Sequence, residues 1–494
     1  MKRTLVSCSF LSLMVILATP LGDAFACGNQ MHAWITMRAL EHVEDPDLKA
    51  FLENGLTGTQ SRDFEAHLRN GTMFPDSGYA YQITSSTYSM ACPTDSGYEE
   101  RDMVMRYGEI AHWEQFQLGY LEQFKLSHPL PTATPNAELE FAFLLGMTSH
   151  GMADQIYDGV LMKGSKHHDA TTGWGPCEYG EPWPYDFARP VYAPFDSATD
   201  ILWTALEGDQ DVPRVSFPGD ALVRTFEADY EDYLDLGLSE CEFSHFTENS
   251  HESLPGNNTG AGLDIESEEL FWNGINLVGF GMELVKGWAE DDQDLGQARI
   301  FYPWAQERFE MSESYGAPES IARFTAKLWE TIYREAIDDQ TWKQATLLGS
   351  FPADGGYEHP ISAESPTSNV SLIFARQVQR GQEFEQLIRW TDSDGNPVSF
   401  QVEHVYGANI LNLRPSSDLA IDTVYQIEII SNLELKHDLS VSAGTAFSFS
   451  TGVAPEPEPT TDDQDESGGC ASTGGLSLPF LFAVLLLRRR RQSS

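Results

Sequence analysis

The stretch that decides the fold reads FAFLLGMTSHGMADQIYD and spans residues 141–158. It lies within residues 138–162, whose apolar spacing predicts a long helix. His150 and Asp154 are four residues apart, so on a helix their side chains share one face about one turn apart. Two such side chains can hold one metal ion, and a carboxylate buried beside an imidazole needs a partner of this kind.

Three other segments add donor groups. His32 follows Cys27 by five residues, Asp76 ends the tripeptide Phe-Pro-Asp, and His112 stands between Ala111 and Trp113. Imidazole nitrogens and carboxylate oxygens are ligands that zinc accepts. If a signal peptide is removed before Cys27, the new α-amine and its carbonyl can also chelate a metal.

Four segments together resemble a known enzyme superfamily. They are CGNQMHAWITMRALEHV from Cys27, FPDSGYAY from Phe74, GEIAHWEQF from Gly108 and the stretch from Phe141. In this order they resemble the zinc-dependent phospholipase C and single-strand nuclease superfamily, closest to the catalytic domain of glycosylphosphatidylinositol-specific phospholipase D. The resemblance covers roughly residues 27–300 and implies a mainly α-helical catalytic domain.

The resemblance also implies a set of metal ligands. Cys27, through its amine and carbonyl, and His32 would hold one zinc ion. A second ion would be held by Asp76, His112 and His150, and Asp154 would bridge the two. Asp76 also matches the carboxylate that serves as general base in the family.

A third metal site departs from the family pattern. The superfamily places a histidine shortly after the bridging aspartate, where this chain has Asp158. A later histidine, followed four residues on by an acidic residue, corresponds here to Asp196 and Asp200. Three carboxylates fit Mg²⁺, Mn²⁺ or Ca²⁺ better than zinc. His167 and His168 are either replacement nitrogen donors or solvated loop residues.

The resemblance implies a metal-dependent hydrolase of the phospholipase C/D type. It would cleave phospholipid-type phosphodiesters through a metal-activated water at a membrane surface. The formal net charge of −45 repels polyphosphates and anionic lipids, so it argues against nucleic acid and favours a zwitterionic substrate. Two alternatives stay open: a nuclease of the same fold, and a non-catalytic surface protein that keeps the fold.

Both ends of the chain read as processing signals. Residues 1–26 carry Lys2-Arg3, an apolar run and Ala24-Phe25-Ala26, as in a secretory signal peptide. Residues 470–494 hold a cysteine, a short apolar segment and an arginine cluster, and resemble the sorting tags of myxobacterial surface proteins. A sorting protease would cleave there, and the alternative is a plain transmembrane anchor. Either interpretation predicts a secreted or surface-anchored protein.

Cysteine usage agrees with an oxidising compartment. The body between the two signals keeps Cys27, Cys92, Cys177 and Cys241. Four cysteines allow up to two disulfides, in any of three pairings.

The rest of the chain divides into a helical part and a β-sandwich. Residues 27–350 show helical spacing, with candidate helices at 33–43, 99–124, 138–162, 268–289 and 319–336, and a long loop between 164 and 194. Residues 360–452 switch to a period of two, with candidate strands at 370–374, 397–402, 410–413, 424–429 and 446–450, and resemble bacterial Ig-like modules. The segment 392–396 suggests an Asp-Gly hairpin turn rather than a calcium loop. Residues 453–469 form an acidic, proline-rich linker.

Overall fold

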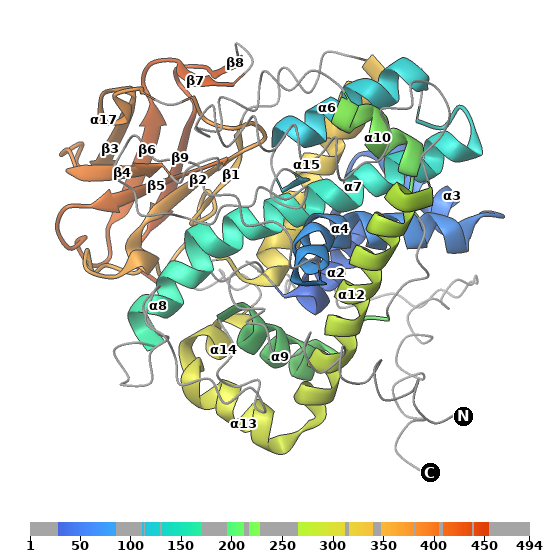
Figure 1. The fold of residues 1–494 in the computed structure, drawn as a ribbon. Helices are drawn as coiled ribbons and strands as arrows, with labels where there is room; N and C mark the ends of the chain where they lie inside the picture. Colours follow the sequence, from blue (N-terminus) through green and yellow to red (C-terminus); the bar gives the residue numbers. More distant parts are fainter. Residues whose placement is uncertain are drawn as a thin grey trace, which may run out of the picture. The chain divides into compact units, whose positions relative to one another are not determined.

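A computed structural model gives the architecture of two parts of the chain, one helical and one built of strands (Figure 1). The structure describes residues 28–84, 111–112, 114–128, 131–169, 195–211, 217–227, 265–311, 316–338, 347–379, 381–404, 409–436 and 439–453. Cys27, the other three body cysteines, the linker and both processing signals lie outside these ranges, so the predictions about them stay predictions.

The helical part confirms the expected mainly α-helical fold. Its helices are α2 (Asn29–His42), α3 (Pro46–Thr57), α4 (Ser61–Thr84), α6 (Glu114–Ser127), α7 (Pro135–Ile156), α8 (Lys163–Asp169), α9 (Phe195–Glu207), α10 (Gly219–Glu227), α12 (Ile265–Glu290), α13 (Asp292–Phe301), α14 (Pro303–Phe309) and α15 (Pro318–Asp338). A π-helical turn, η1 (Tyr157–Met162), joins α7 to α8. Helix α8 occupies the start of the predicted 164–194 loop, which was wrong there.

Helix α7 forms the axis of the helical core. Pro135 stands at its first turn, and the Thr134 side chain caps it by accepting the backbone N–H of Ala137. Every residue from Phe141 to Asp154 is buried, because α2, α4, α6 and α15 all pack against this helix. His150 and Asp154, the metal-ligand pair predicted from the sequence, therefore lie in the centre of the core.

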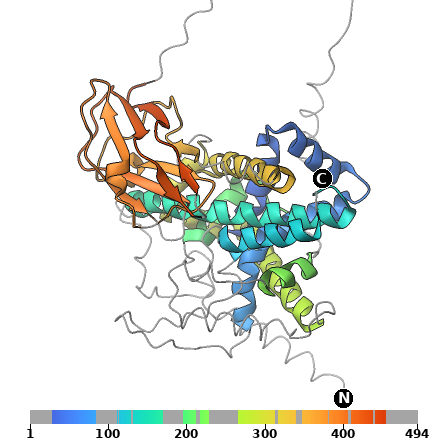
Figure 2. The same cartoon turned by 90° about the horizontal axis from the view of Figure 1, so that it is seen from above.

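Two glycines set the distance between α4 and α7, which cross in Figure 2. A Cβ at Gly71 would lie 2.1 Å from the Phe143 carbonyl oxygen, and one at Gly146 would lie 2.0 Å from the Leu68 oxygen. Only glycine leaves room for backbones this close. The close crossing brings the C-terminal half of α4, with Asp76, to the face of α7 that carries His150.

The strands form an antiparallel β-sandwich. One sheet has the order β1-β2-β5-β4, a second β3-β6-β9, and β7 pairs with β8. The strands are β1 (Leu347–Phe351), β2 (Val370–Phe374), β3 (Ile388–Asp392), β4 (Phe400–His404), β5 (Ile410–Pro415), β6 (Val424–Ile429), β7 (Leu433–Leu435), β8 (Leu439–Val441) and β9 (Ala446–Ser450). The two larger sheets enclose a core around Trp390, Tyr425 and Phe449.

The sandwich begins earlier than residue 360, because β1 pairs with β2. The segment after β3 is a turn, as predicted: the Asp392 carboxylate accepts the backbone N–H groups of Asp394 and Asn396, and Gly395 has a φ of 80°. None of the described helices is long and apolar enough to cross a bilayer, and the apolar segment near the C-terminus lies outside the described residues.

Candidate metal centre

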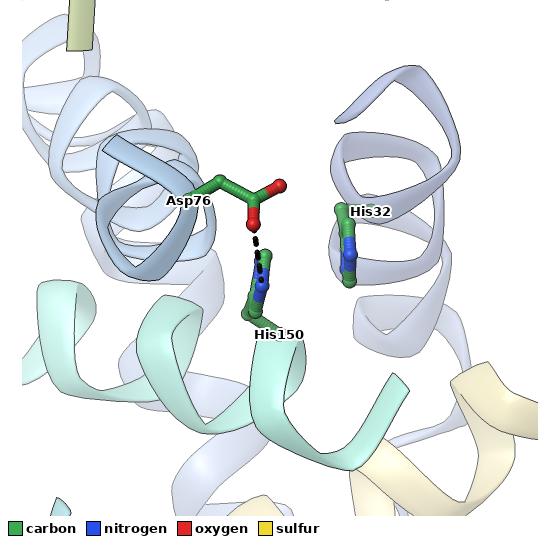
Figure 3. Close-up of side chains that lie close together, drawn as sticks. All are labelled: His32, Asp76 and His150. Carbon is green, nitrogen blue, oxygen red and sulfur yellow. Dashed lines mark ion pairs between the residues drawn. The ribbon is translucent and has the colours of Figure 1, made fainter. Parts of the chain in front are cut away.

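Five of the predicted ligands meet in the middle of the helical core. His32 comes from α2, Asp76 from α4, His112 from the turn before α6, and His150 and Asp154 from α7. Figure 3 shows three of them, with Asp76 and His32 on opposite sides of the His150 ring. Residues up to 122 positions apart in sequence thus converge on one point, as the family resemblance implied.

The Asp154 carboxylate is the hub of this cluster. His32 Nε2 lies 3.0 Å from its Oδ1, while His112 Nε2 and His150 Nε2 lie 3.1 and 3.3 Å from its Oδ2. Each oxygen thus faces at least one imidazole nitrogen, which is the position expected of a carboxylate that bridges two ions.

Asp76 is buried, and its carboxylate makes no hydrogen bond to the described part of the chain. Its side chain is 0 % exposed, and among the described residues neither carboxylate oxygen has a hydrogen-bond partner. The nearest imidazole nitrogens are those of His112 at 3.6 Å and His150 at 3.7 Å from Oδ1. Burying an ionised carboxylate without hydrogen bonds lowers the stability of the fold by roughly several kcal/mol, which is the cost of removing a charge from water. A bound cation would offset this cost.

The His150 ring is oriented so that its Nε2 faces the carboxylates of Asp76 and Asp154. Its Nδ1 donates to the Thr72 carbonyl oxygen at 2.6 Å, since a carbonyl can only accept. In the neutral ring Nε2 is then a bare lone pair, and it lies 3.0 Å from His112 Nε2 and faces both carboxylates. Fixing one ring nitrogen so that the other is presented is how metal-binding histidines are held.

The electrostatics of the cluster reflect its burial. Burial lowers the pKa of His150, with a further contribution from the neighbouring His32 ring, and burial raises the pKa of Asp76. Burial opposes ionisation of Asp154, but the His150 and His32 imidazoles outweigh it and hold its pKa well below the usual range. Burial also opposes protonation of His112, yet the neighbouring Asp154 and Asp76 carboxylates raise its pKa well above the usual value.

A layer of hydroxyl groups supports the ligands, and sequence reasoning missed it. Thr36 Oγ1 lies 2.7 Å from Thr72 Oγ1 and 2.8 Å from Ser149 Oγ, which ties together the three helices that carry ligands. Thr36 follows His32 by one turn and Thr72 precedes Asp76 by one turn. Once His32 and Asp76 are taken as ligands, the four-residue spacing could have identified both threonines from the sequence.

The donor set fits divalent metal ions. Two groups of side chains offer ligand atoms within 4.8 Å of one another, namely His32 with Asp76 and His150, and His112 with His150 and Asp154. The two groups overlap at His150, whose Nε2 can bind only one ion because Nδ1 is engaged by Thr72. Nitrogen and oxygen donors in this mixture suit zinc.

Of the residues predicted for a third ion, Asp158 and Asp200, whose side chains the structure describes, do not join these groups. Asp200 is buried, and its carboxylate accepts the backbone N–H groups of Gln30 at 3.2 Å and Met31 at 2.8 Å. It therefore caps the first turn of α2. Asp158 lies in the π-helical turn, and the side chain of Asp196 lies outside the described part of the chain.

His168, an alternative donor for that third ion, is engaged elsewhere. Its ring stacks on Trp304 with centroids 5.0 Å apart, and its Nε2 lies 2.9 Å from Ser365 Oγ. His168 thus has a packing role in the described structure.

Comparison with known families identifies one part of the chain. Residues 343–451 match the family described as "Bacterial Ig-like domain". The sandwich is a bacterial Ig-like domain. This confirms the predicted C-terminal module, and its start at 343 agrees with the pairing of β1.

Comparison with solved structures and curated proteins adds little. The crystal structure of the N-terminal part of the bacterial S-layer protein SbsC matches 69 % of this chain and 78 % of its own at 11 % identity, with a TM-score of 0.18. The S-layer protein rSbsC(31-844) matches with the same identity and TM-score over 45 % of its length. These TM-scores are too low to bear on fold or function. No curated protein matches the chain.

Proposed function

We propose that this protein is a secreted or surface-anchored, metal-dependent phosphodiesterase that hydrolyses phospholipid-type phosphodiesters. One observation carries the proposal: two buried carboxylates and three imidazoles converge in a helical core, and both oxygens of Asp76 and of Asp154 lack hydrogen-bond partners among the described residues. Two carboxylates buried together repel each other, and divalent cations held between them would offset that repulsion.

The residues of the chain would divide the work between them. His32, His112, His150 and Asp154 would hold divalent ions, and the Thr72 carbonyl would keep His150 presented. Asp76 would bind a metal ion with one oxygen, and with the other it would orient the attacking water and accept its proton. Bound divalent ions supply Lewis acidity, which neutralises phosphodiester charge and lowers the pKa of water.

Charge supports a zwitterionic substrate. The formal net charge of −45 creates a field that disfavours anionic lipids and polynucleotides, most strongly at low salt. A choline-type headgroup carries a compensating positive charge. The nuclease alternative is therefore the weaker one.

A non-catalytic surface protein is the second candidate. Two observations favour it: Asp200, required for a third ion by the family pattern, caps α2 instead, and the chain carries a bacterial Ig-like domain. In that case the metal centre would be structural. The proposed export signals and sorting tag fit this candidate equally well.

Hydrolysis of nitrophenyl-phosphocholine by the purified mature protein tests the proposal. We expect turnover that a chelator abolishes, that added Mn²⁺ or Mg²⁺ supports if a third ion is needed, and that falls when the headgroup is anionic. Asp76→Asn should remove turnover and leave much of the metal bound, whereas Asp220→Asn, on the exposed face of α10, should leave turnover unchanged.

Two outcomes would decide against an enzyme. If the metal-loaded wild-type protein hydrolyses no lipid, nucleotide or model diester, the phosphodiesterase proposal fails and the structural metal centre replaces it. If Asp76→Asn turns over normally, Asp76 is not the base.

A further inference from the structure

One corner of the Ig-like domain is buried in the helical core. Ile373, at the end of β2, and Ile410, at the start of β5, are register partners and fully buried. Both belong to the apolar cluster that contains the ligand-bearing helices. The sandwich's own core instead receives Val370, Leu372, Phe374, Leu411 and Leu413 from these two strands. The domain is thus joined to the helices by packing as well as by the chain.

A buried ion pair lies at this corner, next to a ligand. Arg376 Nη1 lies 3.1 Å from Glu114 Oε1, and the two side chains are only 5 % and 4 % exposed. The second oxygen of Glu114 accepts the backbone N–H of Gln377. Glu114 is the first residue of α6 and lies two residues after His112. The sandwich therefore contacts the turn that carries this proposed ligand.

A second set of contacts from the same corner reaches the segment after Asp154. The backbone N–H of Asn409 donates to Gln155 Oε1 at 2.6 Å, and Asn412 Nδ2 donates to the Gly159 carbonyl oxygen at 2.9 Å. Ser371 Oγ donates to Asn412 Oδ1 at 2.7 Å, which fixes the amide. Gly159 belongs to the π-helical turn, a departure from α-helix that needs partners and that often marks functional sites.

We propose that the bacterial Ig-like domain positions the metal centre, with Glu114, Arg376 and Asn412 as positioning residues for His112 and Asp154. The inference rests on the metal centre of the proposed function. Both anchor points lie within five residues of a proposed ligand, on two separate segments. Their partners come from β5 and from the residues that follow β2, its neighbour in the sheet. The domain therefore acts on the site rather than as a stalk or spacer alone.

The expected size of the effect follows from how metal sites are supported. Removing groups that orient metal ligands commonly weakens metal affinity about 10- to 100-fold. Removing only one member of a buried ion pair would leave an unpaired charge and destabilise the fold. The test therefore replaces both members at once, in the full mature chain.

The experiment measures Co²⁺ binding to three variants by competition with a chromophoric chelator, and records the visible spectrum of bound Co²⁺. Glu114→Gln with Arg376→Met removes the buried pair but keeps an acceptor for Gln377. Asn412→Ser removes the contact to Gly159. Glu403→Gln is the matched control, because Glu403 pairs with Lys163 at 2.6 Å across the same two parts of the chain but is half exposed and away from the ligands.

We expect the Kd for Co²⁺ to rise about tenfold or more in the double variant and in Asn412→Ser, with a shifted Co²⁺ spectrum and unchanged helical circular dichroism. Glu403→Gln should bind as the wild type does. Positioning by the sandwich is overturned if every variant that folds keeps the wild-type Kd and spectrum. Failure of the wild-type protein to bind Co²⁺ or Zn²⁺ would instead refute the metal centre itself, and this inference with it.

Discussion

At the scale of single residues, two buried aspartates show how the same side chain takes different roles. Asp200 is 1 % exposed and satisfied by two backbone N–H groups at the start of α2; burial raises its pKa to about 7. Asp76 is equally buried, but both its oxygens lack such partners among the described residues. The carboxylate whose oxygens lack hydrogen bonds marks the site, and the one that caps a helix does not.

His359 in the Ig-like domain links stability to pH. Its Nε2 donates to the Ser368 carbonyl oxygen at 3.0 Å, its ring packs on Phe449, and burial lowers its pKa from 6.5 to about 4. Between these pKa values the unfolded chain binds a proton that the folded chain does not. His359 therefore costs no stability above pH 6.5, and about 3 kcal/mol is lost as the pH falls to 4.

Replacing His359 with Gln, which keeps a donor for Ser368, should flatten this dependence. We expect the wild-type protein to lose more unfolding free energy than His359→Gln when the pH is lowered from 7 to 4.5, as measured by urea denaturation of both proteins at each pH. Equal losses in the two proteins would show that this ring does not titrate with folding.

At the scale of elements, the α4–α7 crossing builds the site. Gly71 and Gly146 let the two backbones approach, and the hydroxyls of Thr36, Thr72 and Ser149 link α2 to both. Asp76 and His150 project from opposite members of this crossing. A change in helix separation would therefore move a carboxylate relative to an imidazole.

Gly146→Ala should separate these helices. The added Cβ would meet the Leu68 oxygen at 2.0 Å, so we expect a loss of stability of about 2 kcal/mol or more, of the size of overpacking in a core, together with weaker metal binding. Gly287→Ala is the matched control: it lies on an exposed position of α12 with nothing within 4 Å, and alanine there should be neutral or stabilising by up to about 1 kcal/mol. Thermal unfolding of the two variants side by side tests this, and equal melting temperatures would refute the steric account.

Sequence periodicity predicted the elements that carry long, regular patterns. The helix that carries His150, the helices ending near 289 and 336, and the strands at 370–374, 410–413, 424–429 and 446–450 were all anticipated closely. Strands β1, β3, β7 and β8 were missed. Strands β7 and β8 have only three residues each, which is too short for a period of two to be recognised. The π-helical turn was missed for a related reason, since its contacts with β5 come from more than 250 residues away.

The candidate site divides in the same way. The convergence of His32, Asp76, His112, His150 and Asp154 was implied by the family resemblance. Only the pairing of His150 with Asp154 could be derived from their spacing. The role of Asp200 did not, because its partners lie about 170 residues earlier in the chain and no local spacing encodes a capping contact of that range.

At the scale of the whole molecule, the helices and the Ig-like domain would both hold the metal ligands in place if the centre binds metal. The ligands come from separate segments of the helical part, and a corner of the sandwich is buried beside two of them. Binding free energy of a metal to the folded state adds to folding free energy, so both parts of the chain would be stabilised together.

The metal content of the purified mature protein tests the central claim most directly. We predict that mass spectrometry of the zinc-loaded, gel-filtered wild-type protein will find at least two divalent ions per chain. His150→Ala should lose most of them and melt at a lower temperature, because this ring belongs to both donor groups. His128→Ala, which removes an imidazole near Glu140 but no proposed ligand, should keep them. A wild-type protein without stoichiometric metal, or a His150→Ala variant that retains the full content, would contradict the account.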